Sequence, residues 1–582
     1  MKILGISAHF HESAACLLDD GRLVAAAEEE RFSRVKHDAA LPVSAVRFCL
    51  DAGGIDVHEL DCVAYYERPD AKLARQLWSG RVPARSIGLD PLRALREIRE
   101  ALGYEGRLEV FDHHLSHAGA SFLYSGFDEA SILTVDGVGE WTTTAYGRGR
   151  REAIEIFETV EFPHSLGLLY STITSYLGFR VNGGEYKVMG LAPYGRPRFV
   201  QEIRKLLRPG EGGSYELSLE YFDFVKGRTM YSEKLGDLLG EPPRAPESEL
   251  SPFHEDVARS LQQVLEETLL EKVSYLHRKA PSENLCLGGG VALNCVANGR
   301  ILREGPFARL FVQPAAGDSG SCLGAAALAH VRLTGRRHAF APLDHVLLGP
   351  RFSSASVSET LAAAGVSALD YRNREAELLE AVVDRLQEGK VVGWFQGAIE
   401  LGPRALGARS LLADPRRPEM RERLNALVKK REAFRPFAPS ILLGEASRHL
   451  ALDHPSPFML ETCPVRSPLD LPAVTHVDGS ARPQTVDPQH QPRYARLLEA
   501  FRRRTGCPVL VNTSFNVRDE PIVCTPEDAL SCAVRSEIDA LAIEDFLVDR
   551  TGFPRELAEL VRHRDRMAAR QSSIQAALYT FV

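Results

Sequence analysis

The chain has 582 residues, of which 44% are apolar and 25% charged, and its formal net charge is −8. These values are those of a folded globular protein and exclude a disordered or fibrous chain. The length requires more than one hydrophobic core, so we expect two large domains or three smaller ones. The acidic balance disfavours nucleic acid as the main partner. No apolar run is long enough to span a membrane and no signal peptide is recognisable, which predicts a cytoplasmic protein.

Two sets of three short apolar segments are each typical of a β-meander. The segments are residues 3–7, 14–18 and 23–27 in the first set, and 132–135, 142–146 and 153–157 in the second. Both sets share the same plan of strand, polar turn, strand, tight turn and strand. Predicted helices lie between and after them, at residues 42–52, 166–177 and 255–278. The sequence therefore predicts an α/β region that arose by internal duplication.

Two histidines and two aspartates have the placement of metal ligands. His113 and His117 are four residues apart, which puts both side chains on one face of a helix. Asp136 directly follows a predicted strand, and Asp318 follows another apolar segment at 310–312. Nitrogen and oxygen ligands without cysteine suit iron(II), manganese or zinc and argue against a closed structural zinc site. The alternative is that the two histidines cap or line a core helix.

Three consecutive glycines, Gly288, Gly289 and Gly290, follow a predicted strand and precede a predicted helix at 292–302. Glycine allows close backbone approach, and amide groups at a helix start favour phosphate, so this turn could cradle a nucleotide. Asn294 belongs to the same turn. A packing turn between strand and helix explains the glycines about as well.

A domain boundary is predicted at residues 335–350, which lack periodicity and contain two prolines. The predicted domains are residues 1–345 and 346–582. The second domain starts with a predicted helix at 376–387 and a strand at 391–395.

Basic residues are concentrated after that strand, beside glycines and prolines. Arginines on such turns present a planar fork to phosphate or carboxylate oxygens, and lysine adds a compact charge. Hydroxyl and amide side chains further along the chain suit phosphate and ribose. The candidate residues are Arg404, Lys429, Arg435, Arg482, Ser514 and Asn516. A solvated helix face or a plain polar loop is the alternative, and it fits Arg404 and Arg435 least well because both lie among apolar and turn residues.

Ten cysteines are scattered along the chain without any Cys-x-x-Cys pair. Most of them have apolar neighbours in the sequence. We therefore expect reduced, buried thiols rather than disulfides or a cysteine-ligated metal.

Ordered motifs along almost the whole chain resemble the O-carbamoyltransferase family that includes nodulation protein U and the cephalosporin and tobramycin carbamoyltransferases. The motifs are residues 10–15, 29–34, 113–118, 136–137, 185–195, 288–294, 317–318, 402–409, 429–439 and 512–516. The pattern departs from expectation at one turn, where Asp519 stands in place of a glycine. Aspartate can occupy such a turn at some cost in strain.

The resemblance implies a first domain of the actin-like ATPase type, a duplicated ribonuclease-H-like fold. This domain would be similar to the metal-binding subunit that makes threonylcarbamoyladenosine in tRNA. The resemblance implies a YrdC-like α/β fold for the second domain. There ATP, with Mg²⁺, would convert carbamoyl phosphate into carbamoyl adenylate. The first domain would then pass the carbamoyl group to a hydroxyl of a small acceptor, such as a natural product or a sugar.

The resemblance also implies roles for individual residues. His113, His117, Asp136 and Asp318 would hold Fe²⁺ or another divalent ion such as Mn²⁺ or Zn²⁺. Arg404, Lys429, Arg435, Arg482 and Ser514 would form the activation site, and His11 would be the catalytic histidine. Neither nucleic acid nor membrane is an expected partner, while a homodimer stays open. Two other functions compete: threonylcarbamoyl transfer to tRNA, which the acidic charge disfavours, and regulation by nucleotide binding without turnover.

Overall fold

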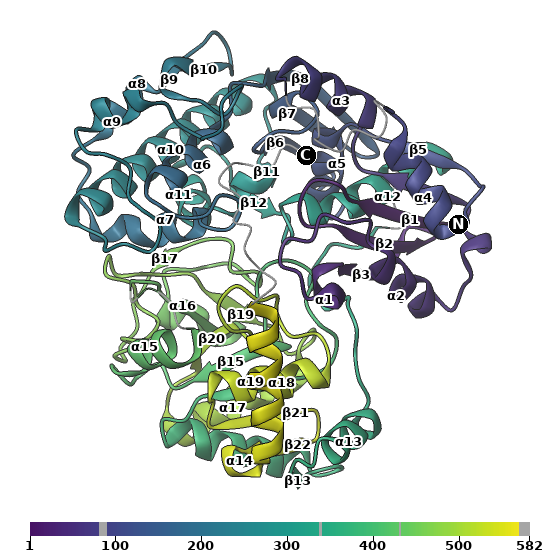
Figure 1. Ribbon diagram of the computed structural model, residues 1–582, viewed down its shortest axis with the longest axis vertical. Coiled ribbons are helices and arrows are strands. Elements are labelled where there is room, and N and C mark those ends of the chain that lie inside the picture. The colour runs from purple at the N-terminus through teal and green to yellow at the C-terminus, as the bar shows by residue number, and fades with distance from the viewer. Residues whose placement is uncertain (81–89, 337–339, 430–431, 433, 570–582) are drawn as a thin grey trace. The chain divides into compact units, whose positions relative to one another are not determined.

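The computed structural model describes residues 1–80, 90–336, 340–429, 432 and 434–569. The described chain divides into two compact units. The first takes in residues 1–33 and 37–343, and the second takes in residues 34–36 and 344–569. Both units mix helices with sheets, which confirms the predicted α/β class (Figure 1). All ten cysteines are free and buried, as the sequence predicted. Among the described helices, none has the length and apolar character needed to cross a membrane.

The first unit contains two five-stranded sheets with the same strand order and the same directions. The orders are β3-β2-β1-β4-β5 and β8-β7-β6-β11-β12. In each sheet three strands form an antiparallel meander, and two later strands run parallel to its first strand. The strand plan that the sequence predicted to occur twice is thus present in both sheets. The strands are β1 (Lys2–Ser7), β2 (Ala14–Asp19), β3 (Arg22–Glu28), β4 (Cys62–Tyr65), β5 (Leu108–Val110), β6 (Glu129–Val135), β7 (Thr142–Arg150), β8 (Ala153–Glu161), β11 (Asn284–Gly288) and β12 (Arg309–Val312).

Helices cover these sheets, so their central strands are buried along most of their length. Helix α12 packs against β1, β2 and β4, and α2 packs against β2 and β3. Gly5 in β1 permits this packing, because a Cβ there would lie 2.1 Å from the carbonyl oxygen of Cys322 in α12. The helices are α1 (Glu30–Ser33), α2 (Val43–Gly53), α3 (Pro69–Trp78), α4 (Arg93–Leu102), α5 (His113–Phe122), α6 (Leu166–Tyr176), α7 (Glu185–Leu191), α8 (Val200–Lys205), α9 (Glu233–Leu239), α10 (Pro252–Lys279), α11 (Cys295–Glu304) and α12 (Asp318–Thr334). A small hairpin pairs β9 (Leu207–Pro209) with β10 (Tyr215–Leu217).

The helix predicted at 292–302 begins three residues later than expected, at Cys295. A short 3-10 turn, η4 (Gly290–Leu293), precedes it. The side chain of Asn294 accepts a hydrogen bond from the Ala297 amide and so caps the helix, a role the sequence reading had not given it.

The second unit is built on one eight-stranded sheet, with the order β13-β22-β21-β14-β15-β20-β16-β19. Its strands are β13 (Leu369–Asp370), β14 (Val392–Phe395), β15 (Arg409–Ala413), β16 (Ala438–Leu442), β19 (Gln484–Val486), β20 (Val509–Ser514), β21 (Ala540–Ile543) and β22 (Phe546–Asp549), while β17 (Cys463–Pro464) and β18 (Ser480–Ala481) form a separate pair. Its helices are α13 (Ser354–Ala363), α14 (Glu375–Gln387), α15 (Met420–Arg423), α16 (Ala446–His449), α17 (Pro492–Thr505), α18 (Pro526–Ser536) and α19 (Arg555–Ala569). Helix α14 and strand β14 confirm the predictions at 376–387 and 391–395. The unit has its own core, in which Trp394, Leu411 and Val511 are fully buried.

Candidate functional site

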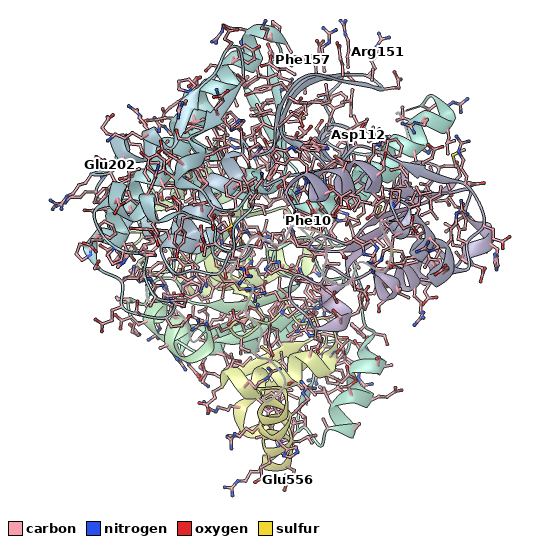
Figure 2. All side chains as sticks on the ribbon, turned by 45° about the horizontal axis from the view of Figure 1, so that its top comes forward. Phe10, Asp112, Arg151, Phe157, Glu202 and Glu556 are labelled. Atoms are coloured by element: carbon pink, nitrogen blue, oxygen red, sulfur yellow. The ribbon has the colours of Figure 1, made fainter. Side chains whose placement is uncertain are left out.

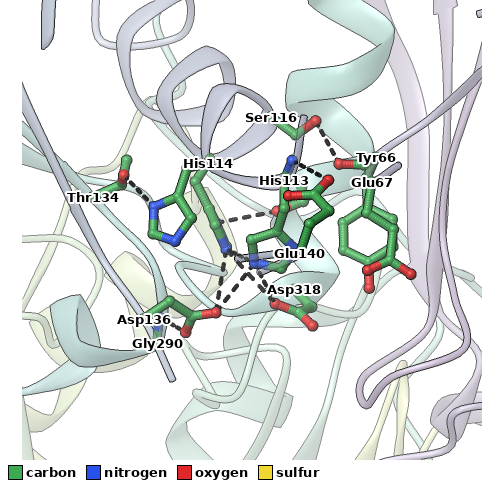
Figure 3. Close-up of polar contacts among 12 residues, drawn as sticks. Tyr66, Glu67, His113, His114, Ser116, Thr134, Asp136, Glu140, Gly290 and Asp318 are labelled. Carbon is green, nitrogen blue, oxygen red and sulfur yellow. Dashed lines mark hydrogen bonds and ion pairs between the residues drawn. The ribbon is translucent and has the colours of Figure 1, made fainter. Parts of the chain in front are cut away.

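Four buried side chains converge in the first unit (Figure 3). His113 and His117 lie on α5, Asp136 follows β6, and Asp318 begins α12. Strands β6, β11 and β12 are parallel, so their carboxyl ends, and the residues that follow them, meet at one edge of the sheet. All four side chains are at most 3% exposed, whereas Asp112, just ahead of α5, is exposed (Figure 2). The structure thus brings together the four residues that the spacing selected, and we call them the metal cluster because their donor atoms could hold one ion.

The distances within the metal cluster suit one shared ion. His113 Nε2 lies 3.1 Å from Asp136 Oδ2 and 3.0 Å from His117 Nε2. Both histidine Nε2 atoms lie 3.6 Å from Asp318 Oδ1. Ligands that bind one ion at about 2.1 Å are themselves roughly 3 to 4 Å apart. The four donor atoms are therefore spaced as ligands of a divalent ion would be.

The chemistry of these side chains also fits a metal. Among the described residues, neither carboxylate oxygen of Asp318 accepts a hydrogen bond, although the side chain is buried. A buried carboxylate without such partners is costly unless a positive charge compensates it. Burial opposes charge on the histidines, but the nearby Asp318 and Asp136 carboxylates outweigh it and raise the pKa of His113 to about 9. The same carboxylates raise the pKa of His117. The cluster therefore attracts positive charge strongly.

Neighbouring side chains fix the orientation of the cluster. His117 Nδ1 lies 3.1 Å from the hydroxyl of Ser321 on α12. Glu140 Oε1 accepts hydrogen bonds from the amides of Arg68, at 2.7 Å, and His113, at 2.9 Å, which anchors the start of α5. Such contacts set which ring nitrogen faces a metal. Glu140 was not predicted as a site residue, although it lies in the turn that starts at Asp136.

The glycine turn touches the metal cluster directly. The amide of Gly290 donates to Asp136 Oδ1 at 2.8 Å, while the other oxygen of Asp136 faces His113. Gly289 has a φ of +87°, and a Cβ there would lie 2.3 Å from the carbonyl oxygen of Val135, so only glycine fits. The amide group of Asn294 is engaged by the protein itself, with both its oxygen and its nitrogen 3.0 Å from the amide of Gln262. These contacts give Asn294 a part in shaping the turn.

His11 lies in the turn after β1, and the backbone on both sides of it is unusual. His9 and Glu12 have positive φ values of 67° and 60°, a conformation that non-glycine residues adopt at a cost and that is common at functional sites. Glu12 Oε1 lies 3.1 Å from His37 Nδ1. A Cβ on Gly317 would lie 2.5 Å from Glu12 Oε2, so this turn packs beside the residue that precedes Asp318.

All the candidate residues of the second unit except Lys429 lie in or beside strand ends at one edge of its sheet, which we call the basic edge. Strands β15 and β16 both run antiparallel to β20, and β19 runs parallel to β16. The starts of these three strands therefore meet the end of β20. Arg404 precedes β15, Arg435 precedes β16 and Arg482 precedes β19, while Ser514 ends β20 and Asn516 follows it.

The side chains at the basic edge are only partly exposed. Arg404, Arg435 and Arg482 are half-buried. The hydroxyl of Ser514 donates to Asn516 Oδ1 at 2.7 Å. Lys429 ends a π-helix, Leu424–Lys429, and its side chain lies outside what the structure describes. Asp519 has a φ of +64°, which confirms that its turn needs the left-handed conformation expected of a glycine.

Comparisons with known proteins cover both units. A family model described as the carbamoyltransferase N-terminus matches residues 2–83 and 97–327, and one described as the carbamoyltransferase C-terminus matches residues 383–550. The uncharacterized protein sll1178 of Synechocystis is 44% identical, over 95% of this chain and 97% of its own length. Nodulation protein NolNO of Sinorhizobium fredii is 38% identical, over 94% of this chain and 81% of its own length. The 3'-hydroxymethylcephem-O-carbamoyltransferase of Amycolatopsis lactamdurans is 37% identical, over 50% of this chain and 53% of its own length.

Proposed function

Because the chain belongs to the carbamoyltransferase family and is therefore a transferase, we propose that it is an ATP-dependent O-carbamoyltransferase. Its acceptor is a hydroxyl of a small molecule, such as a natural product or a sugar. We assign the first unit to the actin-like domain and the second to the YrdC-like domain, with the boundary near residue 345. The observation that carries the proposal is that one chain holds two sites of different chemistry, the metal cluster and the basic edge.

Activation takes place at the basic edge in this proposal. Water takes the phosphoryl group from carbamoyl phosphate and leaves carbamate, whose oxygen then attacks the α-phosphorus of ATP. Carbamoyl adenylate forms, and pyrophosphate leaves with the electron pair of the broken bond. Both steps gather negative charge, which Arg404, Arg435 and Arg482 stabilise together with Lys429 and the Mg²⁺ that ATP carries. Ser514 and Asn516 offer hydrogen bonds to phosphate or ribose.

Transfer takes place in the first unit. His113, His117, Asp136 and Asp318 would hold Fe²⁺, Mn²⁺ or Zn²⁺, which when bound supplies Lewis-acid chemistry to oxygens of the donor. The turn of Gly288, Gly289 and Gly290 lies beside the nucleotide phosphate, and Asn294 keeps this turn in shape. The Gly290 amide is bonded to Asp136 Oδ1 and so links the turn to the metal cluster. His11 accepts the proton of the acceptor hydroxyl while the hydroxyl oxygen attacks the carbamoyl carbon and AMP leaves.

The test is a search for the carbamoylated product by mass spectrometry. The protein is incubated with ATP, Mg²⁺, carbamoyl phosphate and a panel of hydroxyl-bearing acceptors, and reactions lacking one substrate serve as controls. We expect an acceptor heavier by one carbamoyl group, with phosphate, pyrophosphate and AMP each released in an amount equal to the product. Product formation without ATP would refute the adenylate route, and no product or pyrophosphate with any acceptor would refute the function.

A further inference from the structure

One buried carboxylate holds the loop that carries Arg404. We call residues 402–409 the basic loop. Glu400 is 1% exposed, and its Oε1 accepts hydrogen bonds from the amides of Leu406, at 2.7 Å, Ala408, at 2.7 Å, and Arg409, at 3.2 Å. The remaining amide in this stretch, that of Gly407, donates to the hydroxyl of Ser410. Every amide from 406 to 409 therefore has a partner, and three of the four share one oxygen.

The carbonyl groups of the same loop accept hydrogen bonds from other side chains of the unit. Gln484 and Gln491 each donate to the carbonyl of Leu406 at 2.7 Å. Asn512 donates to the carbonyl of Ala405 at 3.2 Å, and the indole of Trp394 donates to that of Gly407 at 2.9 Å. These partners come from separate elements of the second unit. Backbone groups paired in this way do not need water or substrate to be satisfied, so the loop has one built-in conformation.

The two arginines of the basic loop differ in what they contact. Arg409 is fully buried, lies 3.6 Å from the ring centroid of Phe395, and donates to the backbone carbonyls of Gln396, Ala408 and Pro350. Burial lowers the pKa of Arg409, and the Glu400 carboxylate opposes this shift without cancelling it. Arg404 is half-buried at the basic edge. The motif thus contains one structural arginine and one placed to meet a ligand.

We propose that Glu400 is the positioning residue of the basic loop, and that its carboxylate fixes the backbone from which Arg404 reaches the phosphate groups of the substrates. The proposal rests on the proposed function, because it assigns phosphate compounds to this edge. A carboxylate at an anion site would repel the ligand if it were exposed. Here the carboxylate is buried and bonded to three backbone amides, so it acts on the substrate only through the shape of the loop.

The first part of the test measures pyrophosphate binding by calorimetry for the wild-type protein and for Glu400→Gln, which keeps the size of the side chain and removes its charge. We expect the variant to bind pyrophosphate at least about tenfold more weakly, since small misplacements of a binding group are costly. Hydrogen exchange should be faster in the peptide that contains residues 405–409. In turnover assays the KM for carbamoyl phosphate should rise more than kcat falls.

Asp414→Asn is the matched control. Asp414 is also 1% exposed and forms an ion pair with Arg416. It directly follows the last residue of β15, whereas the basic loop leads into the first residue of that strand. This variant should lose stability without losing affinity for pyrophosphate. Equal pyrophosphate affinity in Glu400→Gln and wild type, or equal losses in both variants, would overturn the role of Glu400. The product assay decides the function separately: wild-type protein that forms no carbamoylated product, yet loses pyrophosphate binding on Glu400→Gln, would refute the function and keep the positioning role.

Discussion

The metal cluster and the basic loop differ in how their polar groups are satisfied. In the first unit, buried donor and acceptor atoms face one another around a common point, and both oxygens of Asp318 lack hydrogen bonds among the described residues. In the second unit, the amides from 406 to 409 and the carbonyls from 405 to 408 are all bonded within the protein. The side chains of the metal cluster therefore suit an added positive ion, whereas the backbone of the basic loop is already paired within the protein.

The largest effect we expect is from His11→Ala. Removing a general base lowers rates by about 10²–10⁴-fold, so carbamoyl transfer should almost cease. ATP consumption with carbamoyl phosphate should continue, because the variant leaves the basic edge untouched. Product formation and pyrophosphate release are measured in the same reaction. His58→Ala is the control, since His58 is exposed on the same unit. Equal loss of both activities in His11→Ala would contradict the separation of the two sites.

Metal addition should stabilise the wild-type protein and not Asp318→Asn. An ion at 100 times its Kd raises the free energy of unfolding by about 2.7 kcal/mol. The variant keeps the size of the side chain but loses a ligand, so its thermal unfolding should respond little to a divalent ion or to a chelator. Thermal scans with and without metal measure this.

The exposed neighbour of the cluster provides the control. Asp112→Asn removes a carboxylate that is not part of the cluster, so this variant should gain the same stability from the ion as the wild-type protein. A gain of the same size in Asp318→Asn would show that the ion binds elsewhere.

A pH titration gives a smaller effect that is confined to the second unit. A hydrogen bond to Glu461 outweighs partial burial and raises the pKa of His454 to about 9. Folding thus favours the protonated form, so its stabilisation is complete below pH about 6.5 and is lost as the pH rises through about 9. Chemical unfolding across this range should show a steeper loss in wild type than in His454→Gln. Because His454 is partly exposed, solvent screens its interaction with Glu461, and its contribution to the free energy of unfolding stays below about 1 kcal/mol. Identical pH profiles for the two proteins would rule out this contribution.

The smallest effect is expected at Asp519, whose φ is +64°. Glycine adopts this conformation without strain, so Asp519→Gly should raise the free energy of unfolding by less than about 1 kcal/mol, after allowance for the greater freedom of the unfolded chain. Asp519→Ala should lower it. Denaturant unfolding of both variants measures the two changes, and a glycine variant less stable than the alanine variant would contradict the strain.

The sequence predicted those features that rest on local signals. The spacing of His113 and His117 and the placement of Asp136 after a strand were enough to select residues that the fold brings together. Asn294 was predicted only as part of the glycine turn, and its bond to Gln262, 32 residues away in the sequence, could not be predicted from local spacing. The role of Glu400 could not be predicted from its sequence neighbours. It depends on the conformation of the basic loop, whose other partners include Trp394, Gln484 and Asn512.

The most direct measurement is made on Arg404→Ala supplied with carbamoyl adenylate. We predict that this variant releases almost no pyrophosphate from ATP and carbamoyl phosphate, a loss of about 10²–10³-fold. It should still carbamoylate the acceptor at the wild-type rate when carbamoyl adenylate is provided. The control is Arg503→Ala, a change at an exposed surface arginine. This control should carbamoylate the acceptor at the wild-type rate both from ATP with carbamoyl phosphate and from supplied adenylate. Failure of the supplied adenylate to restore product formation would contradict the division of activation and transfer between the two units.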